Sequence, residues 1–318
     1  MQQCANSILM IRPVGFRYNE QTATNNYYQH VLENLSLKQV QDRAVKEFDD
    51  FVAILKGSGV QVICFEDTEN PETPDSIFPN NWVSFHADGR VGIFPMFAEN
   101  RRGERRKDIF KSLVQSHGFV VNEIVDYSKL EDENVFLEGT GSMVLDRTNK
   151  ICYAAISERT CKIAIEQFCQ NFGYTHVSFT ANQEVGTKRL AMYHTNVMMC
   201  VGDSFAVVCL ESIDNTLERD CVKESLQSTG KEIIEITEEQ TSRFAGNMLQ
   251  VIGDCPYIVM STSAYQSLTH NQIATLEKHG AILHSSLETI EACGGGSARC
   301  MMAELFLPKA GNRNPKNG

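Results

Sequence analysis

One pattern repeats five times along the chain: an amphipathic helical stretch, a glycine and a short apolar strand. In the first copy, four apolar residues share one helical face: Val45, Phe48, Val52 and Leu55. Gly57-Ser58-Gly59 separates that face from a strand at 60–65. Later copies have helices at 109–116, 161–171, 221–228 and 272–279, glycines at Gly118, Gly173, Gly230 and Gly280, and strands at 119–121, 174–179, 231–236 and 281–283. Glycine is common just past a helix end, and the regular spacing predicts five equivalent units.

Apolar hairpins lie between these copies. Turn residues join paired apolar runs at 82–85 and 91–94, 143–145 and 151–154, 197–201 and 205–210, and 248–252 and 257–260. A last strand at 300–307 has no downstream partner, and 8–11 has no upstream one, so we expect these two to pair and close a ring. The sequence predicts an α/β fold: a five-bladed pseudo-symmetric propeller in a single domain, residues 1–308, with strands toward the axis and helices outside. The polar residues 309–318 are expected to form a disordered tail.

The amino-acid composition limits the classes of molecule that this protein could bind. The 318 residues carry a net charge of −11, which argues against nucleic acid or an anionic membrane surface as partner. No apolar run reaches the length of a spanning helix, and no secretion signal precedes the first strand. Eleven scattered cysteines indicate a reducing, cytoplasmic location, and no ligand spacing predicts a metal or other cofactor. The sequence leaves the oligomeric state open.

The residues that precede the first strand of each unit carry the candidate chemistry. They are Asn81, Glu138, His194, Asn247 and Cys300, and equivalent units would bring them to one mouth of the ring. A cysteine with a histidine is a common pairing of nucleophile and general acid/base, and a carboxylate can orient or polarise. Each residue alone has a simpler structural explanation. Cys300 could be an inert buried thiol in the Gly-rich loop 293–302, His194 a histidine of the core, and Glu138 a charged loop residue. Their common register favours an active site.

Four motifs then resemble those of the pentein, or guanidine-modifying, superfamily of arginine and agmatine deiminases, dimethylarginine dimethylaminohydrolases and amidinotransferases. They are Leu137-Glu138-Gly139, Ser157-Glu158-Arg159-Thr160, Tyr193-His194-Thr195-Asn196 and Gly294-Gly295-Gly296-Ser297-Ala298-Arg299-Cys300-Met301. Met10-Ile11-Arg12-Pro13 and Phe78-Pro79-Asn80-Asn81-Trp82 are most similar to the branch called citrulline-utilisation hydrolases. The resemblance covers nearly the whole chain and implies the pentein fold.

The resemblance also implies residue roles. Cys300 would be the nucleophile, His194 the general acid/base, and Glu138 the carboxylate that binds the substrate head group. Arg159 would hold the α-carboxylate of an amino-acid substrate through its planar donors. Arg101, with Arg102 as its rival, matches a second carboxylate-binding arginine. Asn81, Asn196 and Asn247 are expected to bind substrate.

Departures from the superfamily pattern predict the substrate. Relatives that bind a guanidinium have aspartate where this chain has Asn81 and, in arginine deiminases, where it has Asn196; a third carboxylate is absent from Gly139-Thr140-Gly141. A neutral ureido group needs donors as well as acceptors, which asparagine supplies. We therefore expect hydrolysis of L-citrulline to ornithine, carbon dioxide and ammonia. The alternatives are an arginine deiminase or amidinotransferase acting on a guanidino substrate, and a non-catalytic relative that has the fold alone.

Overall fold

The computed structural model describes residues 2–311; residue 1 and residues 312–318 lie outside the described part of the chain. Within it, five three-stranded sheets share one topology, in which the middle strand pairs antiparallel with the first strand and parallel with the third. In chain order these sheets are β3 (Val83–Phe85), β4 (Arg90–Ile93) and β5 (Glu123–Asp126); β6 (Val144–Asp146), β7 (Ile151–Ala155) and β8 (Thr175–Phe179); β11 (Met199–Val201), β12 (Phe205–Val208) and β13 (Glu232–Glu235); β14 (Leu249–Ile252), β15 (Pro256–Ser261) and β16 (Ala281–Ser285); and β17 (Ala303–Glu304), β1 (Ser7–Arg12) and β2 (Gln61–Glu66).

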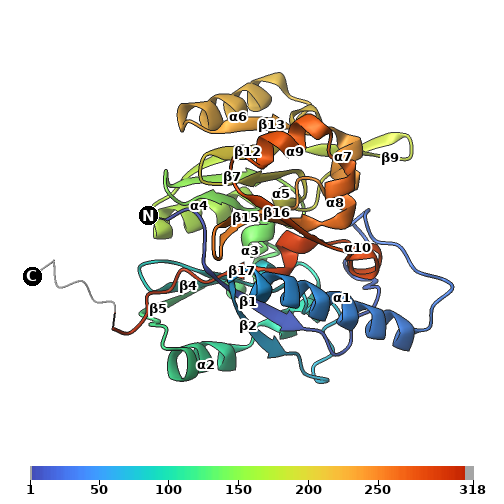
Figure 1. Ribbon diagram of the computed structural model, residues 1–318, viewed down its shortest axis with the longest axis vertical. Helices are drawn as coiled ribbons and strands as arrows, with labels where there is room; N and C mark the ends of the chain where they lie inside the picture. Colours follow the sequence, from blue (N-terminus) through green and yellow to red (C-terminus); the bar gives the residue numbers. More distant parts are fainter. Residues whose placement is uncertain (1, 312–318) are drawn as a thin grey trace, which may run out of the picture.

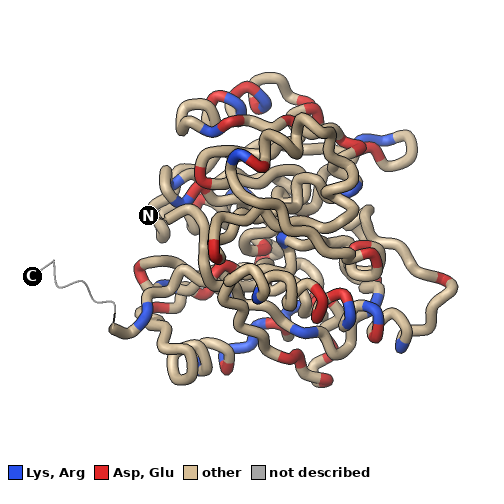
Figure 2. Tube along the Cα trace, in the orientation of Figure 1, with Lys and Arg blue, Asp and Glu red and all other residues tan. Residues whose placement is uncertain are grey.

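A helix connects the second and third strand of each unit, as the repeated pattern predicts. These helices are α1 (Leu37–Gly57), α2 (Lys107–His117), α4 (Lys162–Phe172), α6 (Thr216–Ser228) and α9 (His270–Leu276), which follows α8 (Thr262–Ser267). In Figure 1, α2 and α6 lie at opposite ends of the view and the short α3 (Gly139–Ser142) lies near its middle. Charged residues are found mostly on the peripheral helices and loops, with a few toward the middle of the trace (Figure 2). No helix of residues 2–311 is long and apolar enough to cross a membrane.

The longest helix shows why the pattern folds in this way. Ser36 and Gln39 form a capping box that begins α1, and a row of buried side chains continues along it: Val40, Ala44, Phe48, Phe51, Val52 and Leu55. Gly59, with a φ of 79°, turns the chain into β2. Because Phe48 is fully buried, truncating it to alanine should cost about 3–5 kcal/mol.

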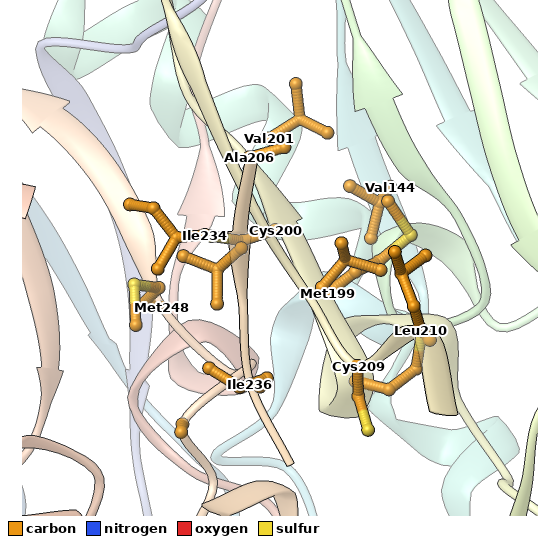
Figure 3. Close-up of a cluster of buried hydrophobic side chains, with 14 of the residues drawn as sticks. Val144, Met199, Cys200, Val201, Ala206, Cys209, Leu210, Ile234, Ile236 and Met248 are labelled. Atoms are coloured by element: carbon orange, nitrogen blue, oxygen red, sulfur yellow. The ribbon is translucent and has the colours of Figure 1, made fainter. Parts of the chain in front are cut away.

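The core lies between units as well as within them. Figure 3 shows side chains of β11, β12 and β13 packed together with Val144 of β6 and with Met248, which precedes β14. The first strands are neighbours: β11 lies against β6 and β14, and β17 lies against β3. The sheets of the described residues are nevertheless separate, and none closes on itself. The α/β architecture and the pairing of Ile8 with Glu304 are confirmed, whereas the propeller stays a prediction.

Three element boundaries were predicted wrongly. The strand after Gly118 is β5, not 119–121, because Phe119 and Val120 pair with Lys309 and Pro308 instead of β4. The fifth helix ends at Leu276, and a Cβ on Gly280 would lie 2.8 Å from the Pro256 carbonyl oxygen, so close backbone approach explains this glycine. The predicted last strand at 300–307 is reduced to β17, because a 3-10 turn, η5 (Ala298–Met301), precedes it.

Other segments were missed or extend further than expected. A two-stranded hairpin, β9 (Asn182–Val185) and β10 (Lys188–Ala191), lies between the second and third units in the chain. Val197 and Met198, predicted as strand, belong to the helical turn α5 (Thr195–Met198). Ala310 donates to the Gly118 carbonyl, so backbone pairing continues past the predicted boundary at 308; the rest of the predicted tail, 312–318, lies outside the described residues. The remaining short helices are α7 (Glu238–Ser242), α10 (Glu288–Gly294), η1 (Pro79–Asn81), η2 (Glu99–Glu104), η3 (Ser128–Glu133) and η4 (Leu210–Ser212).

Candidate active site

Glu138 and His194, two of the residues that precede the first strand of a unit, lie against each other in the interior of the protein. Each occupies the N-cap position of a short helical turn, Glu138 at α3 and His194 at α5. The His194 Nε2 and Glu138 Oε2 atoms are 2.7 Å apart, and neither residue is more than 1% exposed. The Glu138 Oε1 atom accepts from the backbone N–H of Phe97 at 2.9 Å. Glu138 is therefore bonded to the histidine, as the orienting role of a carboxylate requires, and its binding of the substrate head group stays a prediction.

The surroundings of this pair favour a neutral imidazole and an ionised carboxylate. Burial lowers the pKa of His194 to about 4, with Arg159 and Arg101 adding to the effect and Glu138 opposing it. Burial would raise the pKa of Glu138, but Arg159, His194 and Arg101 together hold it well below its usual range. At neutral pH the imidazole is neutral and the carboxylate is ionised. Because a carboxylate only accepts, Nε2–H must donate to Glu138, and Nδ1 is the nitrogen that can exchange a proton with a reactant.

Cys300 lies in η5 at the end of the Gly-rich segment and is 2% exposed. The segment is not the open loop expected from its three glycines, because α10 continues to Gly294 and ends at Gly295 in the left-handed conformation. A Cβ on Gly296 would lie 3.0 Å from the Phe78 ring and 3.4 Å from the Cys300 Cβ atom. This glycine allows the backbone to pass close to both, which brings the thiol to the cavity.

Arg101 and Arg102, left open by the sequence, face different surroundings. Arg101 is 2% exposed and donates to Glu104 from Nε at 2.8 Å and from Nη2 at 2.9 Å. Its Nη1 donates to the Asn81 Oδ1 atom at 3.0 Å. Arg102 is partly exposed, and its Nε lies 3.3 Å from Glu131. Arg101 is therefore the arginine at the site, although Glu104 already engages two of its donors.

Arg159 is 1% exposed and approaches the same carboxylate as His194. Its Nη1 lies 3.6 Å from Glu138 Oε2, and its Nε and Nη2 donate to Asn25 Oδ1 at 2.8 and 2.5 Å. Nη2 also donates to the Thr22 carbonyl at 2.7 Å, and the Tyr193 ring lies 4.9 Å from the guanidinium carbon. Segment 22–29 thus provides the oxygen acceptors that an α-carboxylate would otherwise offer to Arg159.

These side chains surround a small closed cavity. It is lined by Thr22, Asn26, Asp75, Phe78, Asn81, Arg101, Arg159, Tyr193, His194, Gly294, Gly296 and Cys300. Its volume of about 10 Å³ is the space of a single water, so an amino acid can enter only if part of the wall moves. A larger cavity of about 720 Å³ lies elsewhere, lined in part by Tyr27, Arg243 and Glu288, and none of Cys300, His194 and Glu138 lines it. The small cavity is the one that Cys300 and His194 line.

Sequence reasoning missed Asp75, a carboxylate in the cavity wall. Asp75 is 2% exposed, and its Oδ2 accepts from Asn19 at 2.7 Å and from Thr22 at 3.2 Å. Its Oδ1 has no partner among residues 2–311, and burial raises the pKa of this carboxyl group. Asp75 stands in the polar run between β2 and η1, outside any repeated motif, so its only sequence signal is an acidic residue shortly before the apolar pair Ile77-Phe78.

The three predicted asparagines divide into two groups. Asn81 lines the cavity, and its Nδ2 has no partner in the described part of the chain. Asn196 and Asn247 do not line it; their Nδ2 atoms lie 3.4 and 3.2 Å from the Cys300 Sγ atom. The amides of Asn196 and Asn247 are thus turned toward the sulfur, and a contact of either residue with substrate stays a prediction. Among residues 2–311, no cluster of histidine, cysteine and acidic side chains could hold a metal ion.

The fold and the arrangement of cysteine, histidine and carboxylate define a class: the pentein superfamily of arginine-modifying enzymes. The chain belongs to the family described as "N,N dimethylarginine dimethylhydrolase, eukaryotic", whose sequence profile matches residues 12–307. It is accordingly an enzyme, a hydrolase of C–N bonds, and not the non-catalytic relative considered above. Comparison with the sequences of curated proteins found no match.

Solved structures share the fold at low sequence identity. The N-terminal domain of ArgZ, an arginine dihydrolase from the ornithine-ammonia cycle in Cyanobacteria, is 18% identical with a TM-score of 0.70, and the match covers 95% of this chain and 99% of that one. AgrE, solved with ornithine and NAD+, is 17% identical with a TM-score of 0.71, over 96% of this chain and 40% of AgrE. A dimethylarginine dimethylaminohydrolase adduct with S-methyl-L-thiocitrulline is 15% identical with a TM-score of 0.62, over 95% of this chain and all of that one.

Proposed function

We propose that this enzyme hydrolyses the ureido group of L-citrulline through a covalent intermediate on Cys300. Arg159 would bind the substrate α-carboxylate in place of Asn25, Asp75 would accept from substrate N–H groups, and Arg101 would orient Asn81. In this proposal residues 1–308 form one catalytic domain, the five units stand around one axis as propeller blades, and the active site opens at one mouth. The eleven free cysteines suit a cytoplasmic location.

The orientation of the Asn81 amide carries the choice of substrate. A guanidinium has only donors, so the group that faces Arg101 Nη1 at 3.0 Å must be the oxygen of Asn81. The Nδ2 group is then turned away from Arg101, and it has no partner among residues 2–311. The ureido oxygen of citrulline would accept from this N–H, whereas arginine has no acceptor on its head group and would leave the donor unpaired.

The side chains supply each proton step of the proposed reaction. Neutral His194 takes the proton from Cys300, and the thiolate attacks the ureido carbon. The C–N bond to the first amine breaks as the imidazolium returns its proton to that amine, leaving a thiocarbamate on the sulfur. Glu138 stabilises the transient imidazolium. His194 then deprotonates water, which attacks the thiocarbamate carbon, and the C–S bond breaks to release a carbamate. The remaining C–N bond breaks as this carbamate loses carbon dioxide, so citrulline and one water yield ornithine, carbon dioxide and ammonia.

A second candidate substrate, arginine, is favoured by a different observation. Asp75 lines the cavity, and its unpartnered Oδ1 atom would accept equally well from a guanidinium; Glu138, bonded to His194, adds a second carboxylate nearby. The same nucleophile would then release ammonia and form citrulline, as in a deiminase, or ornithine after a second hydrolysis. The solved relative ArgZ is an arginine dihydrolase, which is consistent with this candidate.

Product analysis separates the two candidates. We expect ornithine and ammonia from citrulline, slower turnover of arginine, and a loss of at least about 10³-fold in Cys300→Ser, as for other enzymes that lose their nucleophile. Cys293→Ala, in the same segment, is the matched control and should retain activity. Asn81→Asp should lower citrulline turnover and raise that of arginine, because an acceptor replaces the donor. Faster turnover of arginine than of citrulline by the unmodified enzyme would overturn the substrate assignment.

A further inference from the structure

The amide of Asn247 is held in one orientation. Asn247 is fully buried two residues before β14, and its Oδ1 accepts from the backbone N–H of Arg299 at 3.0 Å. A backbone N–H only donates, so the amide oxygen must face Arg299. The Nδ2 group consequently points the other way, where it donates to the Asn196 carbonyl at 2.9 Å and to Cys300 Sγ at 3.2 Å. The sulfur therefore faces a fixed N–H donor.

The side-chain amide of Asn196 also contacts the Cys300 sulfur atom. It is fully buried in α5, and its Nδ2 lies 3.4 Å from Cys300 Sγ. Its Oδ1, which could accept from a neutral thiol, lies further away at 3.9 Å. The closest atoms of both asparagines to the sulfur are donors, and N–H donors favour an ionised sulfur over a thiol.

We infer that Asn247 and Asn196 are positioning residues for the nucleophile: their amides stabilise the Cys300 thiolate and fix its direction of attack, and they do not bind substrate. The inference rests on the proposed role of Cys300. It explains why two polar side chains are fully buried behind the cavity wall. It also separates substrate recognition, assigned to Asn81, from activation of the sulfur.

Other charged and titratable groups surround the sulfur and must be held constant in any test. Asp75, His194, Arg101, Arg159 and Tyr193 line the cavity with Cys300, and Glu138 lies behind His194. Arg299 approaches from the segment of Cys300 itself, close enough to interact electrostatically with the sulfur. Substitutions at the two asparagines leave all these groups in place, so a changed pH profile reports the loss of the amide donors.

The test is the pH dependence of Cys300 alkylation by iodoacetamide, followed on the peptide that contains Cys300. In Asn247→Ala we expect the midpoint of the rate profile to move upward by about one pH unit, the usual size for one hydrogen bond to a charged group. Asn247→Asp keeps the acceptor for Arg299 and nearly the same shape but replaces the donor, so its midpoint should rise at least as far. Asn196→Ala should show a smaller rise, because its donor is more distant.

Steady-state kinetics provide a second readout. The asparagine variants should lower kcat about tenfold with KM nearly unchanged, whereas Asn81→Ala should mainly raise KM. A profile of Asn247→Asp that superimposes on the wild type would mean a structural role and overturn the inference, and so would a rise in KM alone. If Asn247→Ala does not fold, the other two variants decide. An unreactive Cys300 in the wild type would instead refute the proposed function, so the two failures are distinguishable.

Discussion

Two clusters of buried charged side chains differ in how completely their polar atoms are paired. In the first, Glu304 accepts from Arg299 at 2.9 Å and from Arg147 at 3.3 Å, and Arg299 also donates to the Met302 carbonyl at 2.8 Å. None of these side chains has a buried polar atom without a partner in the described chain. In the second, around Glu138, the Asp75 Oδ1 and Asn81 Nδ2 atoms have no partner within residues 2–311.

This difference in the pairing of polar atoms suggests that one cluster stabilises the fold and the other serves the active site. A buried polar atom without a partner costs stability, so a fold retains such atoms where something else needs them. In the Glu304 cluster every buried polar side-chain atom of Glu304, Arg147 and Arg299 has a partner. Because the cluster joins β17 to the loop after β6, it stabilises the contact between two units. In the Glu138 cluster, defined as Glu138, His194, Arg101, Arg159, Asp75 and Asn81, one acceptor and one donor have no partner within residues 2–311, and both belong to residues that line the cavity with Cys300. These are the two kinds of partner that a ureido group needs.

The largest stability effect should come from the complete cluster. Glu304→Gln leaves Arg147 and Arg299 buried without their carboxylate, and we expect a loss of about 3–5 kcal/mol in the free energy of unfolding. Urea denaturation measures it. The control is Glu66→Gln, which breaks an exposed ion pair with Arg12 at 3.2 Å and should cost less than about 1 kcal/mol. If both variants lost the same free energy of unfolding, the claim that the Glu304 cluster stabilises the fold would be contradicted.

An intermediate effect on the free energy of unfolding is expected from the titration of His194. Its pKa is about 4 in the folded protein, below the ordinary 6.5, so between these values the unfolded chain binds a proton that the folded protein does not. Stability should therefore fall as the pH is lowered through this window, by about 3 kcal/mol in total. His194→Gln should lack that part of the acid destabilisation in urea denaturation, while His270→Gln, at an exposed histidine, should follow the wild type. Parallel pH curves for His194→Gln and the wild type would contradict the assignment of a neutral, buried imidazole.

The smallest stability effect is expected at the incomplete cluster. Asp75→Asn replaces a buried carboxylate that has an unpartnered oxygen, so the free energy of unfolding should change by less than about 1 kcal/mol. The KM for citrulline should nonetheless rise about tenfold, because a substrate N–H loses a charged acceptor. Asp67→Asn, at a buried aspartate that accepts from Thr73 at 2.8 Å, is the control and should leave KM unchanged. A large loss of stability with unchanged KM at Asp75 would place it with the structural cluster.

Much of the fold and the core of the site could be predicted from local patterns. Gly118, Gly173 and Gly230 mark helix ends because each adopts the left-handed conformation, and this local requirement is visible in a single sequence. Glu138, His194 and Cys300 share a register because they precede equivalent strands. Chain order alone therefore indicated that they should meet.

The rest depends on contacts that chain order does not encode. The direction of the Asn81 amide is set by Arg101, and that of Asn247 by the Arg299 backbone, so identifying them as asparagines could not tell which way each amide points. Asp75 belongs to no repeat and reaches the cavity only through tertiary packing. Cys300 lies in a 3-10 turn where an apolar run suggested a strand, because the Gly-rich segment packs against Phe78.

Acid quenching during turnover of citrulline, followed by mass spectrometry of the cysteine-containing peptides, tests the central claim most directly. The account predicts an adduct on the peptide that contains Cys300: a carbamoyl group if ornithine leaves first, or a carbamoyl group that still carries ornithine if ammonia leaves first. It should form and disappear at rates that match ornithine production, with the other ten cysteines unmodified. Ornithine production without any adduct on Cys300, or an adduct on another cysteine that turns over at the same rate, would contradict it.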